Sequence, residues 1–141
     1  MYQEHFKLTR QPFSQHAAAY SLWIDDRMNE GLARLTYLVE GGTVGLVTGP
    51  TGVGNSALLK RFLADRPQRC EAAYCHLTHL RSSGVLKSLV VQFGEVPRLG
   101  KDRLFEQILS AARRVEGTLL VVMDEAHLLD GEALTDLRLL I

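Results

Sequence analysis

The sequence lacks most of the features that mark secreted, membrane or nucleic-acid-binding proteins. Its 141 residues include only two cysteines, which excludes a disulfide framework and favours a reducing compartment. No apolar run approaches the roughly 20 residues that span a bilayer, and the opening residues MYQEHF contain no signal-peptide segment. Sixteen basic and sixteen acidic residues cancel, so no overall field attracts nucleic acid or a membrane. These absences predict a cytoplasmic protein.

What the sequence does contain is the composition of an ordinary globular protein. Hydrophobic residues make up 46% of the chain and charged residues 23%. That balance and this length suffice to bury one core, so we expect one domain. There are no internal repeats and no low-complexity segments.

The most informative stretch is residues 43–62, TVGLVTGPTGVGNSALLKRF. The apolar run 44–47 predicts a strand, residues 49–54 a glycine loop, and the apolar spacing from Ala57 onward a helix. The two outer glycines have the G-x-x-x-x-G spacing of a phosphate-binding loop, and Ser56 stands where such a loop places a Mg²⁺-ligating hydroxyl. The order strand, loop, helix therefore predicts a polyphosphate site.

Physical chemistry explains this spacing. The backbone amides of Gly52, Val53 and Gly54 can point inward as an anion nest, beside the unpaired amides of the new helix. A side chain at Gly52 or Gly54 would crowd the phosphates or resist the positive φ that the loop needs.

One residue departs from the motif, because Asn55 stands where lysine is expected. The amide of Asn55 is uncharged and falls short of a lysine ammonium by roughly 2.5 Å. Losing one preorganised donor to a developing oxyanion slows a reaction by about 10²- to 10³-fold, so we expect hydrolysis to suffer before binding does.

A second landmark is the segment 118–127, TLLVVMDEAH. Its apolar residues 119–123 predict a central parallel strand that is buried on both faces. Asp124 and Glu125 follow at the carboxyl end of this strand, where open α/β sheets bind ligands. We expect Asp124 to hold Mg²⁺ through water and Glu125 to orient or deprotonate an attacking water. His127 is given no chemical role.

Shorter signals predict the remaining elements. They are a helix that Asp25 or Asp26 caps and Gly41 ends, a strand over 72–77, a helix over 83–93, and a helix that Asp102 caps and Gly117 ends. Residues 1–22 are expected to be irregular, with apolar anchors packing across the domain edge at Phe6, Leu8, Pro12, Phe13 and Tyr20.

A metal cluster built from Cys70, Cys75, His76 and His79 is disfavoured. Cys75 and His76 are neighbours in the predicted strand, so they point to opposite faces and cannot both ligate one ion without distortion.

The motif order resembles a known family of ATPases. HFKLTRQPF, GPTGVGNS and LLVVMDEAHLL followed by EALTDLRLL resemble the AAA-type ATPases of the ExeA/GspA group linked to type II secretion. They are also similar to the TniB/TnsC-like ATPases of transposition systems. The resemblance implies an α/β P-loop NTPase fold, a three-layer αβα arrangement with a parallel sheet that is incomplete at the C-terminus. Residues 1–42 would be an arm and helix packing on a partial core, residues 43–141, with Walker A at 49–56 and Walker B at 119–125.

Carried onto this sequence, the resemblance implies ATP and Mg²⁺ as cofactors. Glu125 would be catalytic, and the metal would be held at Ser56 and Asp124. The nucleotide would be bound by Gly49, Pro50, Thr51, Gly52, Val53, Gly54, Asn55, Ser56 and Ala57.

The chain ends at Ile141, within the helix expected after Walker B. The family's sensor strand, arginine finger and lid would lie further on. We therefore expect a fragment in which the strands near Thr43 and Thr118 lack the strand that should lie between them.

Three functions stay open at this point. The first is an ATPase whose hydrolysis drives assembly or remodelling of a membrane secretion apparatus or a transposition complex. The resemblance also implies that the protein oligomerises and pairs with a membrane secretion component or with transposition proteins. A non-hydrolysing nucleotide-binding regulator is the second function. A DNA-associated transposition ATPase is the third, although its basic residues are interpreted as solvated helix faces: Arg98, Lys101, Arg103, Arg113 and Arg114.

Overall fold

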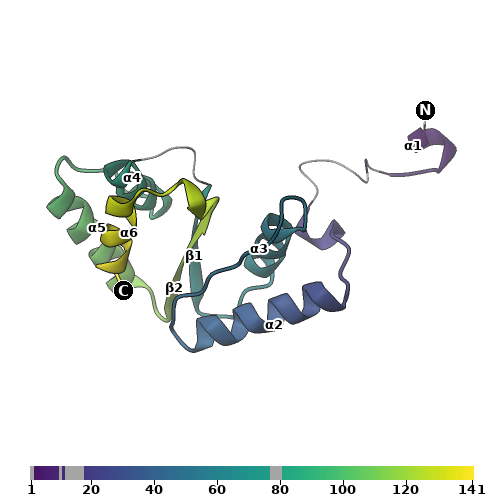
Figure 1. The fold of residues 1–141 in the computed structure, drawn as a ribbon, viewed down its shortest axis with the longest axis horizontal. Helices are drawn as coiled ribbons and strands as arrows, with labels where there is room; N and C mark the ends of the chain where they lie inside the picture. Colours follow the sequence, from purple (N-terminus) through teal and green to yellow (C-terminus); the bar gives the residue numbers. More distant parts are fainter. Residues whose placement is uncertain (1, 10, 12–17, 77–80) are drawn as a thin grey trace. The chain divides into compact units, whose positions relative to one another are not determined.

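The computed structural model of the protein describes residues 2–9, 11, 18–76 and 81–141. The chain divides into two compact units, Met1–Arg66 and Pro67–Ile141 (Figure 1), which are described in turn.

The first unit is helical in its described residues. Its elements are α1 (Tyr2–His5), the 3-10 helix η1 (Ala19–Ser21), α2 (Asp26–Glu40) and α3 (Asn55–Ala64). The boundaries of α2 follow local chemistry. The side chain of Asp25 accepts a hydrogen bond from the Met28 amide at 2.8 Å, and Gly41 is the C-cap. This confirms the predicted helix and selects Asp25 over Asp26 as its cap.

Helices α2 and α3 pack closely against each other. A β-carbon at Gly31 would lie 3.0 Å from the side chain of Leu58, so a larger residue there would require Leu58 to shift. Val39 and Phe62 are buried in the described part of the chain. Arg61 ties η1 to α3, because its Nη1 donates to the carbonyl oxygen of Ala19 at 3.3 Å.

The prediction of a strand over residues 44–47 is wrong. Residues 43–50 have no regular structure, and Val44 and Leu46 are 69% and 81% exposed. A strand needs a neighbouring strand to pair its amides and carbonyls, and the described residues of the first unit offer none. The segment packs on α2 instead, where a β-carbon at Gly45 would meet the side chain of Leu38 at 2.5 Å.

The predicted apolar anchors near the N-terminus are also not buried. Phe6 and Tyr20 are 66% and 71% exposed, and Leu8 is exposed as well. Pro12 and Phe13 lie outside the described residues.

The described residues of the second unit form a two-stranded parallel sheet and three α-helices. Its elements are β1 (Cys70–His76), α4 (Ser82–Gln92), α5 (Lys101–Arg114), β2 (Thr118–Asp124), the 3-10 helix η2 (Ala126–Leu128) and α6 (Gly131–Arg138). Strand β1 pairs with β2 in parallel, from Cys70 opposite Thr118 to His76 opposite Asp124. The strand, helix, strand order confirms the predicted α/β class.

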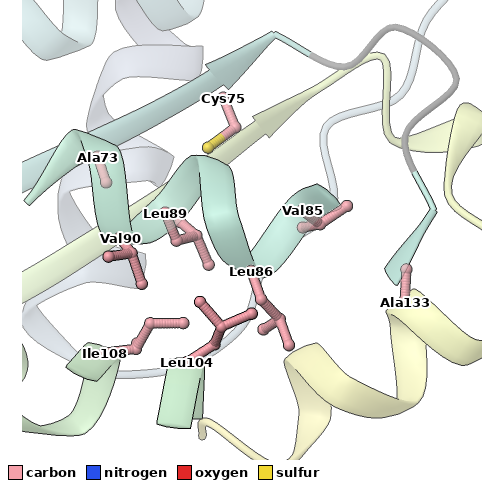
Figure 2. Packing of buried hydrophobic residues seen from close by; sticks show 9 residues of the cluster. All are labelled: Ala73, Cys75, Val85, Leu86, Leu89, Val90, Leu104, Ile108 and Ala133. Carbon is pink, nitrogen blue, oxygen red and sulfur yellow. The ribbon is translucent and has the colours of Figure 1, made fainter. Parts of the chain in front are cut away.

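The core of this unit lies between the sheet and the helices. Figure 2 shows Ala73 and Cys75 of β1 above α4, with side chains of α5 and α6 on the other side of α4. The cluster comprises Ala73, Cys75, Val85, Leu86, Leu89, Val90, Leu104, Ile108 and Ala133. Because alternate strand residues face opposite sides, Tyr74 and His76 lie on the sheet face away from α4.

Two predictions for this unit need correction. Residues of β2 from Leu119 to Val121 are only half-buried, because β2 has one partner strand among the described residues. Asp102 is not the cap of α5; it lies in the first turn and Gly100 is the N-cap, with φ of 98° that glycine adopts readily.

A polar cluster joins the three helices. The buried hydroxyl of Ser82, at the start of α4, donates to Asp136 Oδ2 of α6. Lys101 Nζ of α5 lies 2.7 Å from the same oxygen and 2.6 Å from Glu132 Oε1. These ion pairs hold the pKa of Asp136 below its usual range and that of Lys101 above it.

Candidate functional site

The glycine loop has the backbone that its spacing predicts. Gly52 has φ of 85° and Gly54 has φ of 102°, both in the left-handed region that favours glycine. Gly54 is the N-cap of α3, and the amide of Leu58 bonds its carbonyl at 2.8 Å. The loop therefore delivers the chain directly into the N-terminus of a helix, where amides point outward.

Not every amide of the loop is available to a ligand. The amide of Val53 donates to the Pro50 carbonyl oxygen at 3.2 Å, closing a turn, and the predicted role of Val53 in the nest stays a prediction. Among the described residues, the amides of Gly52 and Gly54 have no backbone acceptor. The anion-binding capacity of the loop therefore rests on these two amides and on the first turn of α3.

The side chain of Asn55 lies against the beginning of the loop. A β-carbon at Gly49 would come 3.1 Å from both Asn55 Nδ2 and Oδ1, and 2.6 Å from Val53 Cγ1. A side chain at Gly49 would therefore require the side chains of Val53 and Asn55 to move, and the Asn55 amide lies beside the first glycine of the loop.

A pocket of about 440 Å³ opens beside this loop within the first unit. One wall is formed by the loop and the start of α3, including Thr48, Gly54 and Leu58. The other wall contains Trp23 and Met28, from the start of α2 and the segment before it. This volume falls within the range of about 300–1,000 Å³ typical of ligand pockets.

Sequence reasoning missed the second wall of the pocket. Trp23 is 86% exposed, which is unusual for the only tryptophan of a chain. Its position directly before a capped helix was the available signal, but no periodic pattern includes it.

Asp124 is buried at the carboxyl end of β2 and both of its carboxylate oxygens are hydrogen-bonded. Oδ1 accepts from the Glu125 amide at 3.0 Å, and Oδ2 accepts from the phenol of Tyr74 at 2.6 Å. Burial and the neighbouring Asp124 raise the pKa of Tyr74 well above its usual range. The phenol therefore stays protonated and acts as the donor.

Glu125 follows in a strained backbone conformation. Its φ of 59° and ψ of 38° place a non-glycine residue in the left-handed region, which costs about 1–3 kcal/mol. Its side chain is 44% exposed, and Oε2 lies 3.3 Å from His127 Nδ1. His127, to which sequence reasoning gave no role, thus contacts the second carboxylate.

The structure brings the predicted site residues together in two groups. Residues 49–57 are contiguous on the loop and α3 in the first unit, and Asp124 and Glu125 are adjacent in the second. That Ser56 and Asp124 meet at one Mg²⁺ stays a prediction.

The residues considered for other functions have ordinary structural roles. Cys75 is buried against α4 whereas the side chain of His76 is 60% exposed, so they face opposite sides as predicted; His79 lies outside the described residues. Of the basic residues, Lys101 pairs with Glu132 and Asp136, and Arg114 pairs with Glu95.

A glycine loop entering a helix, together with a parallel strand ending in Asp-Glu, defines a P-loop NTPase. Comparison with known families agrees, because the AAA domain family matches residues 39–141. The chain belongs to this AAA domain family, and its fold is of the α/β P-loop NTPase class.

A particular relative narrows this assignment. The chain is 32% identical over 153 aligned residues to "General secretion pathway protein A" of Aeromonas hydrophila. The alignment covers 99% of this chain and 27% of that protein, so the chain spans about a quarter of the relative's length. The chain is thus an AAA domain that is similar to this part of the secretion pathway protein. No solved structure matches it. None of the helices among the described residues has the length and apolar character needed to cross a membrane.

Proposed function

We propose that this chain binds ATP together with Mg²⁺ at the glycine loop. The observation that supports this most directly is the loop backbone, in which Gly52 and Gly54 take positive φ beside the N-terminus of α3. Backbone amides and a helix N-terminus together attract a polyphosphate without needing the missing lysine. The pocket of about 440 Å³ beside the loop leaves room for the rest of a nucleotide.

The purine ring of the nucleotide would lie at the second wall of the pocket. Trp23 presents a large exposed aromatic surface there, and Met28 adds a polarisable side chain. Ring stacking on tryptophan would orient the base while the loop holds the phosphates.

The side chains fit Mg²⁺ as a cofactor. The ion prefers oxygen ligands and keeps several waters, which suits the hydroxyl of Ser56 and the carboxylate of Asp124 acting through water. When bound, Mg²⁺ neutralises charge that develops on the phosphates. Asp124 is already oriented by two hydrogen bonds, so little ordering is needed on binding.

Hydrolysis to ADP and phosphate is the activity we propose for the family site, at a reduced rate here. Glu125 would accept a proton from the attacking water as the bond between the γ-phosphorus and the bridging oxygen breaks. The exposed carboxylate at the end of β2 is suited to this role. Asn55 provides no positive charge for the negative charge that develops on the β- and γ-phosphates, which supports slow turnover or pure nucleotide binding.

The pathway we propose is secretion, because the relative's name refers to a general secretion pathway. The chain would act in the cytoplasm, in an oligomer that pairs with a membrane secretion component. The basic residues of α5 favour a DNA-binding role less, since Lys101 and Arg114 are already paired with carboxylates.

Fluorescence of the only tryptophan tests this proposal. Titration of the full chain with ATP and Mg²⁺ should change Trp23 emission saturably, and ADP should compete. Trp23→Phe should abolish the signal but keep binding in calorimetry, with affinity weaker by roughly three- to tenfold. If neither emission nor heat changes at millimolar nucleotide, the proposal is wrong.

A further inference from the structure

The carboxylate of Asp124 is fixed by two donors from different parts of the second unit. The amide of Glu125 reaches Oδ1 at 3.0 Å from the next residue of the chain. The phenol of Tyr74 reaches Oδ2 at 2.6 Å, across a sequence separation of 50 residues. Because each oxygen has its own donor, the carboxylate plane cannot rotate freely.

The sheet register explains why Tyr74 can make this contact. His76 lies directly opposite Asp124, and Tyr74 lies two residues earlier on the same strand. Residues two apart on a strand share a face, so Tyr74 reaches Asp124 diagonally on the sheet face away from α4. On the opposite face of β1, Ala73 and Cys75 are packed in the core, which holds the strand that carries Tyr74 in place.

His76 is a weaker candidate for the same role. Its Nδ1 lies 3.7 Å from Asp124 Oδ2, beyond hydrogen-bond length, and its side chain is 60% exposed. An exposed ring at that distance does not fix a carboxylate, whereas the shorter contact from the half-buried Tyr74 does.

We propose that Tyr74 is a positioning residue that holds the Asp124 carboxylate in the orientation needed for its water-mediated contact with Mg²⁺. This inference rests on the proposed function, in which Asp124 serves the metal. The phenol acts on the metal through Asp124 and does not touch the nucleotide. Groups that orient a metal-binding carboxylate commonly affect metal affinity.

The test compares nucleotide affinity with and without Mg²⁺ for the full chain and for Tyr74→Phe. This substitution removes only the hydroxyl. We expect the affinity for ATP with Mg²⁺ to fall by roughly ten- to a hundredfold, the usual cost of removing a group that orients a metal-binding side chain. The affinity for ATP in the presence of EDTA should not change. Tyr37→Phe is the matched control, because Tyr37 is 80% exposed on α2, and it should change neither value.

A double-mutant cycle separates positioning from a general effect on the fold. In an Asp124→Asn background the carboxylate is gone, so adding Tyr74→Phe should change Mg²⁺-dependent affinity no further. An additive effect would contradict the proposal, as would unchanged or tighter MgATP binding by Tyr74→Phe alone. If Tyr74→Phe fails to fold, Tyr74→Gln, which keeps a donor, gives the same comparison and should retain part of the Mg²⁺ effect.

The outcomes for the two proposals differ. Absence of MgATP binding by the unmodified chain would overturn the proposed function and this inference with it. Normal Mg²⁺-dependent binding by the unmodified chain, with the same dependence in Tyr74→Phe, would overturn only the role of Tyr74.

Discussion

Gly117 lies directly against the main chain of Arg69. A β-carbon at Gly117 would come 2.0 Å from the Arg69 carbonyl oxygen, and that oxygen accepts the amide of Thr118 at 2.9 Å. This contact lies directly before the first residues of β1 and β2, where it helps to set the register that brings His76 opposite Asp124 at the other end. A glycine far from the candidate site thus helps to define its geometry.

The first prediction concerns this contact. Gly117→Ala should lower the free energy of unfolding by about 2 kcal/mol or more, because φ is 133° there and the new methyl meets backbone that cannot move aside. Urea denaturation measures the change. Gly131→Ala is the matched control, since a β-carbon there meets nothing within 4 Å. Equal stability of both variants would show that the approach of Gly117 to Arg69 is not tight.

The second prediction concerns pH and the polar cluster of Ser82, Lys101 and Asp136. The pKa of Asp136 is lowered, chiefly by Lys101, so its contribution is present above its unfolded pKa of about 3.9 and is lost as pH falls through the folded value. The pKa of Lys101 is raised, chiefly by Asp136, so its contribution is present below about 10.4 and is lost as pH rises through the folded value.

Melting temperatures measured across a range of pH test this expected pH dependence of stability. The second unit should be most stable between about pH 4 and pH 10, and Asp136→Asn should weaken the decline at both ends. A variant with the same pH profile as the unmodified chain would show that the cluster contributes nothing.

The third prediction tests whether MgATP binding depends on the backbone conformation of Gly54, since steric crowding plays no part there. A β-carbon at Gly54 meets nothing within 4 Å, but φ is 102°, so Gly54→Ala forces the loop amides out of position. We expect MgATP affinity to fall by at least about tenfold, measured by calorimetry. Gly42→Ala also replaces a positive-φ glycine that lies in open space, with φ of 60°, but lies outside the loop. It should lower stability and leave affinity unchanged; an equal loss of affinity in both variants would exclude a specific role of the loop.

The fourth prediction concerns the missing lysine. Asn55→Lys places an ammonium within reach of the outer phosphates, and we expect MgATP binding to tighten by about tenfold or more. Phosphate release should also rise if turnover is limited by this residue. Asn55→Met, of similar reach and no charge, is the control. Equally tight binding by the chain and both variants, with no phosphate release, would favour a nucleotide-binding regulator.

The sequence predicted those elements whose causes are local. The start of α2 depends on the Asp25 side chain, and the loop depends on glycines at Gly52 and Gly54 that accept positive φ. Contacts between distant residues could not be predicted in this way. The bond from Tyr74 to Asp124 needs the register of two strands, and the turn from Val53 to Pro50 depends on the detailed path of the loop.

Errors in the sequence interpretation have the same origin. Residues 44–47 read as a strand by composition, yet a strand also needs a partner, which no local pattern supplies. Asp102 suits an N-cap by residue type, but α5 begins at Lys101 with Gly100 as its N-cap, so Asp102 lies in the first turn. The place of Trp23 in the pocket could not be predicted, because it depends on how the segment before α2 lies beside the loop.

The central proposal is that Ser56 and Asp124 serve one bound metal-nucleotide complex. NMR of the chain with ATP and Mn²⁺ in place of Mg²⁺ tests this, because the paramagnetic ion broadens the amide signals of nearby residues. We predict that the signals of both Ser56 and Asp124 broaden, and that the diamagnetic MgATP complex leaves them sharp. Broadening of Ser56 alone, with Asp124 and Glu125 unaffected, would contradict the account.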